Sequence, residues 1–215
     1  MCAKNGDPPL KRKGISRRSF VKGLGTGTLA AASISTGVVS VSPKKTQAQQ
    51  IPKISGPGVT PLTLIINGLT YEVNAEPRET LLEVLRNRLD ITGPKLVCDR
   101  GTCGACTVYL NGLPIYACMT LAIEVQSVEI TTIEGLAQGD NLHPAQEAIV
   151  EADAIQCGFC TPGFAMSMAA ALERNPSATH QEVKQSLTGH LCRCGTYVQM
   201  DRAIELALQK MGGAS

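Results

Sequence analysis

The sequence K-L-V-C-D-R-G-T-C-G-A-C-T-V, from Lys95 to Val108, decides the fold of the region around it. It contains three cysteines, and a fourth follows after eleven intervening residues, so the spacing is C-x4-C-x2-C-x11-C. The four are Cys98, Cys103, Cys106 and Cys118. This spacing is the plant-type pattern for a [2Fe–2S] cluster, whose irons take soft thiolate ligands. We therefore expect a metal-binding loop.

Two glycines in this loop support the same interpretation. Three thiolates on one loop must converge on two neighbouring irons, so the backbone has to curl around them. Gly101 and Gly104 permit this, because glycine alone adopts positive φ without a Cβ penalty. Backbone N–H groups that point inward, with help from Arg100, would then favour the negative charge of the cluster.

A second group of cysteines lies in Q-C-G-F-C-T-P-G at 156–163 and L-C-R-C-G at 191–195. Its members are Cys157, Cys160, Cys192 and Cys194. Spacing alone leaves a zinc site or disulfides open for this group. Two features favour a second cluster. Gly158 and Gly195 permit close backbone approach, and the cysteines lie at expected helix starts, where free N–H groups stabilise anionic sulfur.

The hydrophobic pattern predicts an α+β fold with two domains, at 61–134 and 135–215, after a linker at 49–60. Apolar runs at 62–66 and 69–73 flank Asn67-Gly68 and predict a β-hairpin. A second hairpin is expected at 107–110 and 114–118 around Asn111-Gly112, and a further short strand at 127–131. The first domain is therefore expected to be a small sheet.

Helices are expected beside and after these strands. Thr80, with Glu83 three positions on, forms a capping box, and Leu81, Leu82, Leu85 and Leu89 follow on one helical face. From His143 onward the β-branched runs end, and four helices are predicted at 144–154, 162–174, 179–187 and 198–211. The second domain is thus expected to be all-α, with each cysteine pair in a loop between two helices.

Charge and motif content exclude several functions. Residues 1–48 hold nine Lys/Arg and one Asp, a balance of +8, whereas residues 49–215 hold eleven Lys/Arg and seventeen Asp/Glu, a balance of −6. The acidic globular part argues against a nucleic-acid-binding face. No nucleophile–base pair stands out, so we expect an electron carrier without catalytic residues.

The histidines and several methionines are given structural roles. His143, His180 and His190 are interpreted as caps or surface residues, and Met166, Met168, Met200 and Met211 as core filler.

The segment 1–48 is predicted to be a twin-arginine export signal. Arg17 and Arg18 lie in S-R-R-S-F-V-K, ahead of a weakly apolar stretch from Gly23 to Val41. That stretch is too rich in Gly and hydroxyl residues for a stable membrane span, which needs ~20 apolar residues. Export predicts a periplasmic protein, and this route carries proteins already folded around their cofactors. Retention of the segment as an uncleaved anchor stays open.

Together, the two cysteine groups, Gln156 directly before Cys157, and the run L-C-R-C-G-T-Y resemble the iron–sulfur subunit of the xanthine dehydrogenase/aldehyde oxidoreductase family of molybdenum hydroxylases. The resemblance covers about residues 61–211. It implies a β-grasp, plant-type ferredoxin domain with the distal [2Fe–2S] cluster, then a four-helix domain with the proximal one. It also implies that Gln156 and Cys194 lie against a molybdopterin, Cys194 remaining an iron ligand.

The resemblance further implies partners. A separate large subunit would carry the molybdopterin, commonly as the cytosine dinucleotide, and would hydroxylate an aldehyde or an N-heterocycle. Electrons would pass through the proximal and distal clusters to FAD on a third subunit or to a cytochrome. The alternatives are a stand-alone exported ferredoxin-like electron carrier and a secreted, disulfide-stapled binding module.

Three positions depart from the usual pattern of that family. Val97 stands where Gly is usual before the first cysteine, His190 replaces a common Asn, and Gly195-Thr196 inverts a frequent Thr-Gly. None of them is an expected ligand. Val97 is expected to alter the conformation of the first loop and so the distal potential.

Overall fold

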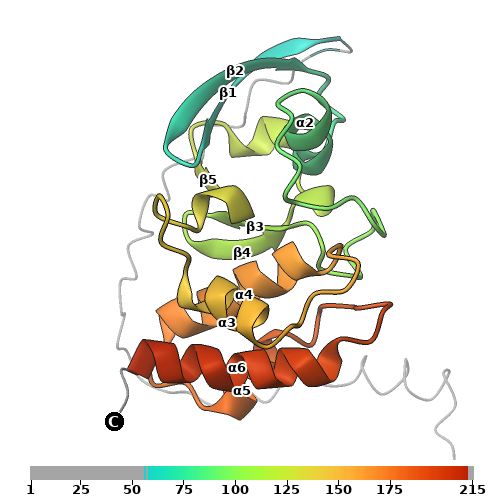
Figure 1. The fold of residues 1–215 in the computed structure, drawn as a ribbon. Coiled ribbons are helices and arrows are strands. Elements are labelled where there is room, and N and C mark those ends of the chain that lie inside the picture. The colour runs from blue at the N-terminus through green and yellow to red at the C-terminus, as the bar shows by residue number, and fades with distance from the viewer. Residues whose placement is uncertain (1–55, 57, 213–215) are drawn as a thin grey trace, which may run out of the picture. The chain divides into compact units, whose positions relative to one another are not determined.

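The computed structural model describes residues 56 and 58–212 of the chain. The predicted export signal and most of the predicted linker lie outside these residues. Within them, the strands come first, with one α-helix among them, and a group of four α-helices follows, as Figure 1 shows. No helix in this part of the chain is long and apolar enough to cross a membrane.

A five-stranded sheet is built from two hairpins and one short strand. β1 (Thr60–Ile66) and β2 (Leu69–Ala75) are antiparallel and joined by Asn67-Gly68, both with positive φ, 52° and 77°. Such a turn matches the twist of hairpin strands. β3 (Thr107–Leu110) and β4 (Leu113–Tyr116) form the second hairpin. β5 (Glu129–Thr131) lies between the hairpins, parallel to β1 and antiparallel to β3, which gives the order β2-β1-β5-β3-β4.

One helix, α2 (Leu81–Asn87), packs on this sheet. It begins at the predicted capping box, in which the Glu83 N–H donates to Thr80 Oγ1 and the Thr80 N–H donates to the Glu83 carboxylate. Leu81, Leu82 and Leu85 are buried as predicted. The helix ends at Asn87, so the predicted fourth member of its apolar face, Leu89, lies beyond it.

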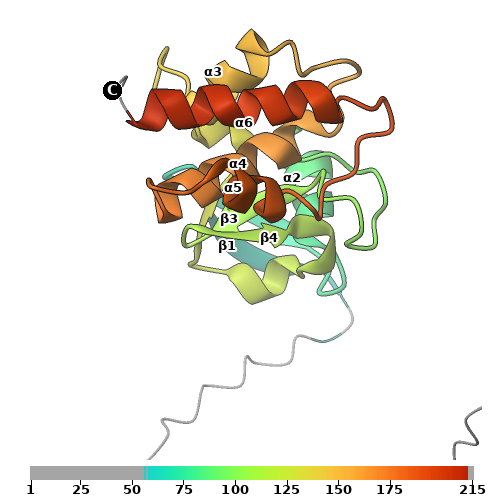
Figure 2. The ribbon, with the colours of Figure 1, turned by 90° about the horizontal axis from the view of Figure 1, so that it is seen from below.

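Four helices follow, close to their predicted bounds. They are α3 (Pro144–Glu151), α4 (Thr161–Arg174), α5 (His180–Ser186) and α6 (Tyr197–Gly212). α6 packs against α3, and α4 packs against β3 and β4 as well as against its helical neighbours. Figure 2 shows α5 and α6 on the outer side of this layer, with the sheet behind. Three short 3₁₀ turns were not predicted: Ala117–Met119, Ala122–Val125 and Ile133–Gly135.

The buried residues fall into two hydrophobic clusters. One joins the strands to α2, and the other joins the helices and includes Tyr109 from β3. The Tyr109 side chain is 3% exposed, and its hydroxyl donates to the Met166 carbonyl of α4. The sheet and the helices therefore pack on each other, and the described residues form one compact unit. The domain boundary between 134 and 135 stays a prediction. Met166, Met168 and Met200 are buried in the helical cluster, as core residues should be.

Candidate metal centres

The first site gathers the cysteines of the first motif. Three lie in loop 95–106 between α2 and β3, and the fourth lies in the 3₁₀ turn Ala117–Met119 that follows β4. The four are Cys98, Cys103, Cys106 and Cys118, all free thiols. Cys118 was expected at the end of a strand. The register of the hairpin, with Thr107 opposite Tyr116, carries the turn back alongside the loop. Cys98 is half-buried and the other three are buried.

The thiols of the first site lie as two pairs. Cys98 is within hydrogen-bonding reach of Cys103, and Cys106 of Cys118. Two pairs of thiolates are the ligand set of a [2Fe–2S] cluster, in which each iron takes two protein ligands. Among residues 56 and 58–212, no three His, Cys, Asp or Glu side chains converge as the ligands of a single metal ion.

Backbone N–H groups point at these sulfurs, as predicted. The Gly101 N–H donates to Cys118 Sγ and the Thr102 N–H to Cys98 Sγ, each at 3.4 Å. Gly101 and Gly104 have φ of 69° and 71°. Arg100 is exposed, and its Nε donates to the Cys98 carbonyl, so this side chain supports the loop through its backbone.

The metal-free thiols of the first site differ in acidity. Burial raises the pKa of Cys98, but hydrogen bonds from the Thr102 side chain and the Arg100 backbone outweigh burial and bring the pKa to about 6. Burial raises the pKa of Cys106 to about 12. Because a thiol must lose its proton to bind a metal, Cys98 is ready at neutral pH, whereas Cys106 releases a proton on binding.

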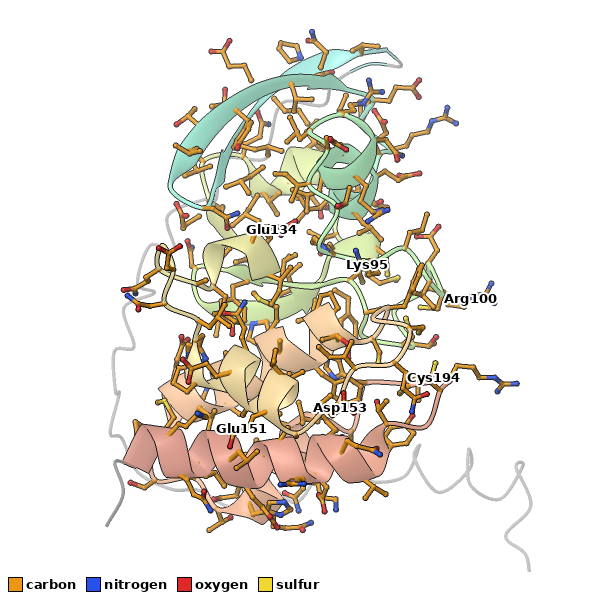
Figure 3. All side chains as sticks on the ribbon, viewed as in Figure 1. Lys95, Arg100, Glu134, Glu151, Asp153 and Cys194 are labelled. Atoms are coloured by element: carbon orange, nitrogen blue, oxygen red, sulfur yellow. The ribbon has the colours of Figure 1, made fainter. Side chains whose placement is uncertain are left out.

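The second site gathers the cysteines of the second motif from two separate connections. Cys157 and Cys160 lie between α3 and α4, and Cys192 and Cys194 between α5 and α6. In this site each close pair of thiols contains one cysteine from each connection. Cys157 lies near Cys194, and Cys160 lies near Cys192. Cys160 and Cys192 are buried, whereas Cys157 and Cys194 are exposed. In Figure 3, Cys194 and Arg100 lie on the same side of the molecule.

Hydroxyl groups accompany the sulfurs of the second site. Thr196 Oγ1 lies 3.1 Å from Cys192 Sγ, and the Thr196 N–H donates to the same sulfur. Burial raises the pKa of Cys192, but these two bonds outweigh burial and bring it to about 7. The Thr161 hydroxyl, beside Cys160 at the start of α4, is buried without a partner among the described residues. Paired thiols, donors on sulfur and an orphaned hydroxyl all fit a bound cluster.

Gly158 and Gly195 serve the second site through their backbone conformation. Their φ values are 82° and 84°. A Cβ at either position would meet no atom within 4 Å. Positive φ is the observed reason that glycine is favoured here, and the predicted close approach of this backbone to a cluster stays a prediction.

The two sites touch each other. The Leu191 N–H donates to the Cys103 carbonyl at 3.0 Å. At the start of α4, Gly163 packs on Gly104 so closely that a Cβ on Gly163 would lie 2.2 Å from the Gly104 oxygen. Residues of both sites also line one cavity of about 490 Å³. Sequence analysis missed these contacts, although the glycine of C-T-P-G was an available signal for close packing.

The remaining predicted residues have mixed outcomes. Gln156 is exposed beside Cys157, and its contact with a molybdopterin stays a prediction. His143 caps α3, as expected, since its Nδ1 accepts from the Ala145 N–H. The interpretation of His190 as a cap or surface residue was wrong. It is 5% exposed, and burial lowers its pKa to about 4.

Comparison with known proteins identifies this arrangement. Residues 67–156 match a family described as a 2Fe-2S iron-sulfur cluster binding domain, and residues 132–205 match the [2Fe-2S] binding domain. The chain is 40% identical over 207 residues to the aldehyde oxidoreductase iron-sulfur-binding subunit PaoA of Escherichia coli K12, covering 89% of this chain and 87% of that protein. The chain belongs to the iron–sulfur subunits of the xanthine dehydrogenase/aldehyde oxidoreductase family.

Other relatives of this family agree. The nicotine 6-hydroxylase small subunit of Paenarthrobacter nicotinovorans is 45% identical over 139 residues, which are 65% of this chain and 84% of that protein. Quinoline 2-oxidoreductase from Pseudomonas putida 86 superposes with a TM-score of 0.66 at 35% identity, covering 73% of this chain and 99% of that one. Aldehyde oxidoreductase from Desulfovibrio gigas superposes with a TM-score of 0.67 at 35% identity, and the match covers 73% of this chain and 18% of that one. Like its relatives, the chain is a small, non-catalytic, electron-transferring subunit of the oxidoreductase type, and the resemblance inferred from the motifs is confirmed.

Proposed function

We propose that this chain is the electron-transfer subunit of a periplasmic molybdenum hydroxylase that oxidises an aldehyde or an N-heterocycle. The names of its relatives support both substrate classes, aldehydes through PaoA and N-heterocycles through nicotine 6-hydroxylase and quinoline 2-oxidoreductase. Electrons would arrive from a molybdopterin, commonly the cytosine dinucleotide form, on a large partner subunit. They would leave to FAD on a third subunit or to a cytochrome.

In this proposal each site holds one cluster. The β-grasp, plant-type ferredoxin domain (61–134) holds the distal one at the first site, and the four-helix domain (135–215) holds the proximal one at the second. When bound, each [2Fe–2S] cluster supplies a one-electron carrier. The chain's own residues hold the eight thiolates in pairs, direct N–H and O–H groups at the sulfurs, and keep water from the buried side of each site.

The observation that carries this proposal is the bond from the Leu191 N–H to the Cys103 carbonyl. Leu191 directly precedes Cys192, a ligand of the second site, and Cys103 is a ligand of the first. A single hydrogen bond and one peptide unit therefore connect the two ligand sets. Such a continuous bonded path couples two redox centres better than a gap of solvent does. A protein with two unrelated structural metal sites has no need of it.

The exposed rim of the second site is suited to a partner. Apolar side chains with large exposed fractions lie along it: Ile155 40%, Phe159 55%, Leu191 56%, Tyr197 48% and Val198 78%. Several of them line the cavities beside the cysteines. Gathered apolar exposure of this kind marks interaction surfaces. We place the molybdopterin-binding subunit here, with its cofactor against Gln156 and Cys194.

Periplasmic location rests on the leader, which lies outside the described residues. Replacement of Arg17 and Arg18 by Lys should keep the protein in the cytoplasm with its clusters loaded, because the twin-arginine route requires the paired arginines. Cell fractionation with an antibody against the chain measures this. Periplasmic protein from the Lys variant would contradict the export route.

The decisive experiment is purification of the native assembly through a C-terminal tag on this chain. We expect about four irons per chain, two distinct [2Fe–2S] signals by electron paramagnetic resonance (EPR) after reduction, and a co-purifying molybdenum subunit. Two irons per chain, or zinc at the second site, would contradict the two-cluster proposal. Two clusters without a molybdenum partner would indicate the stand-alone electron carrier instead.

A further inference from the structure

His190 lies where the two cysteine sites meet. It directly precedes Leu191 and Cys192, and it is 5% exposed. Its Nε2 lies 3.2 Å from Thr107 Oγ1 and 3.0 Å from Ser167 Oγ. Thr107 follows the first-site ligand Cys106, and Ser167 is on α4, the helix that begins beside the second-site ligand Cys160. One imidazole therefore links both sites.

The hydrogen-bond roles at Nε2 follow from Thr107. Its hydroxyl donates to the Gly104 carbonyl at 2.7 Å, so its single proton is already used. The Thr107 oxygen can then only accept, so a hydrogen bond from His190 to it requires the ring proton on Nε2. Ser167 Oγ, 3.0 Å from the same nitrogen, can pair with Nε2 in either tautomer. In both cases Nε2 joins the first loop, through Thr107, to α4, through Ser167.

The ring also fills the space above the first cysteine loop. A Cβ on Gly104 would lie 2.5 Å from His190 Cδ2, and Gly104 has a φ of 71°. The ring centroid lies 5.2 Å from that of Phe164 on α4 and 6.5 Å, edge-on, from that of Tyr116 on β4. The imidazole is therefore wedged between the loop, the helix and the strand.

We propose that His190 is a positioning residue that sets the electronic coupling between the two sites. Its Nε2 and its ring fix the connection 187–196 on loop 95–106, so that the next N–H, that of Leu191, reaches the Cys103 carbonyl. This inference rests on the proposed function, since it concerns electron transfer between the clusters.

Three substitutions separate the contribution of the bond from that of the ring. His190→Gln keeps an N–H donor near the position of Nε2, His190→Phe keeps the ring without the donor, and His190→Ala removes both. His180→Gln is the matched control, because His180 lies on α5 and its Nε2 is 3.3 Å from Asp201, which belongs to neither cysteine site. All four are compared with wild type as cluster-loaded protein of the full chain.

The first readout is hydrogen exchange of peptides from 187–196, followed by mass spectrometry. In His190→Ala we expect the exchange at the Leu191 amide to rise about tenfold, the size of one lost hydrogen bond. His190→Gln should restore most of the protection, and His190→Phe less. The control should match wild type.

The second readout is the magnetic interaction between the two reduced clusters, seen as extra splitting of their EPR signals. We expect this splitting to weaken in His190→Ala at unchanged iron content and to recover in His190→Gln. The proposal would be overturned if His190→Ala showed the same hydrogen exchange at the Leu191 amide and the same EPR splitting as wild type. If the alanine variant does not load iron, the other two variants decide. The proposal would then be overturned if His190→Gln and His190→Phe both matched wild type in hydrogen exchange and in EPR splitting.

The two hypotheses fail in different ways. A wild-type chain that binds fewer than about four irons contradicts the proposed function. The exchange measurement does not depend on electron transfer, and it still tests whether His190 positions the connection.

Discussion

The first and second sites hold the same number of cysteines in different ways. The first takes three ligands from one continuous loop. Cys98 is half-buried, and the other three cysteines of this site are buried. The second takes two ligands from each of two helix connections, and one cysteine of each connection, Cys157 and Cys194, is exposed. The first site is thus closed by its own loop and the turn after β4. The second site is closed only on its inner side, where Cys160 and Cys192 are buried.

This difference teaches what each site requires of its surroundings. A loop that closes around its own metal centre depends little on the rest of the fold. A centre assembled from the ends of α3, α4, α5 and α6 depends on how these helices pack. Its open side, beside Gln156 and the apolar rim, is where the proposed partner would complete it. The following predictions test this contrast, from the largest expected effect to the smallest.

Replacement of one ligand in each site should reveal their independence. Cys98→Ser removes a thiolate at the half-exposed edge of the first site. We expect iron to fall from about four to about two per chain, with loss of the distal EPR signal alone. Cys157→Ser is the matched variant and should lose the proximal signal alone. Loss of both signals in either variant would show that the sites assemble as one unit.

Packing between the sites should be most sensitive at Gly163. In Gly163→Ala, the added Cβ would lie 2.2 Å from the Gly104 carbonyl oxygen, and backbone cannot yield as a side chain can. We expect a loss of about 1–3 kcal/mol, typical of overpacking, and a matching fall in the midpoint of thermal unfolding. Gly212→Ala in α6 is the control, since its Cβ meets nothing within 4 Å. Equal midpoints for the two variants would contradict the close packing.

The same contacts mark the limit of what the sequence predicts. The hairpin at Asn67-Gly68 and the capping box at Thr80 were predicted because each signal lies within a few residues. The two cysteine groups were recognised from their spacing, although the first extends to Cys118 and the second spans residues 157–194. Helix bounds were predicted within a turn for the same reason.

The junction between the sites was not predicted. Thr107 and His190 are 83 residues apart, and no spacing rule connects them. His190 was interpreted as a cap or surface residue because its burial depends on a loop, a helix and a strand meeting around it. The pairing of thiols across two connections in the second site has the same origin, since it follows from helix packing and leaves no local pattern.

The second site should respond to loss of one hydroxyl. Thr196→Val removes the O–H that lies 3.1 Å from Cys192 Sγ but keeps the backbone N–H donor. Hydrogen bonds to sulfur favour the more negative, reduced state, so the proximal potential should fall. A differential of about 1 kcal/mol corresponds to roughly 40 mV for one electron.

An EPR-monitored redox titration of the purified protein measures this shift. The distal potential is the internal control, because Thr196 contacts no sulfur of the first site in the described structure. Thr196→Ser should restore the wild-type value. Equal shifts at both sites would show that the change acts through general unfolding of the junction.

The caps of the two halves should differ in their response to pH. α2, which leads into the first loop, is capped by Thr80, whereas α3, which leads into the second site, is capped by Nδ1 of His143. Burial lowers the pKa of His143 below 6.5, although Glu173 acts in the opposite direction. The stability that this cap contributes is therefore complete above pH 6.5 and is lost as the pH falls through the lower folded pKa. Protonation of Nδ1 removes the acceptor for the Ala145 N–H.

His143→Asn tests this, because asparagine caps a helix without titrating in this range. Between pH 7.5 and pH 5, wild type should lose about 1 kcal/mol more stability than the variant, or about 2–4 °C in the thermal midpoint. The Thr80 cap contains no histidine, so Thr80→Asn should leave the wild-type pH profile unchanged. If His143→Asn and wild type lost stability in parallel, the helical half would have no histidine-dependent cap, and this contrast between the two sites would disappear.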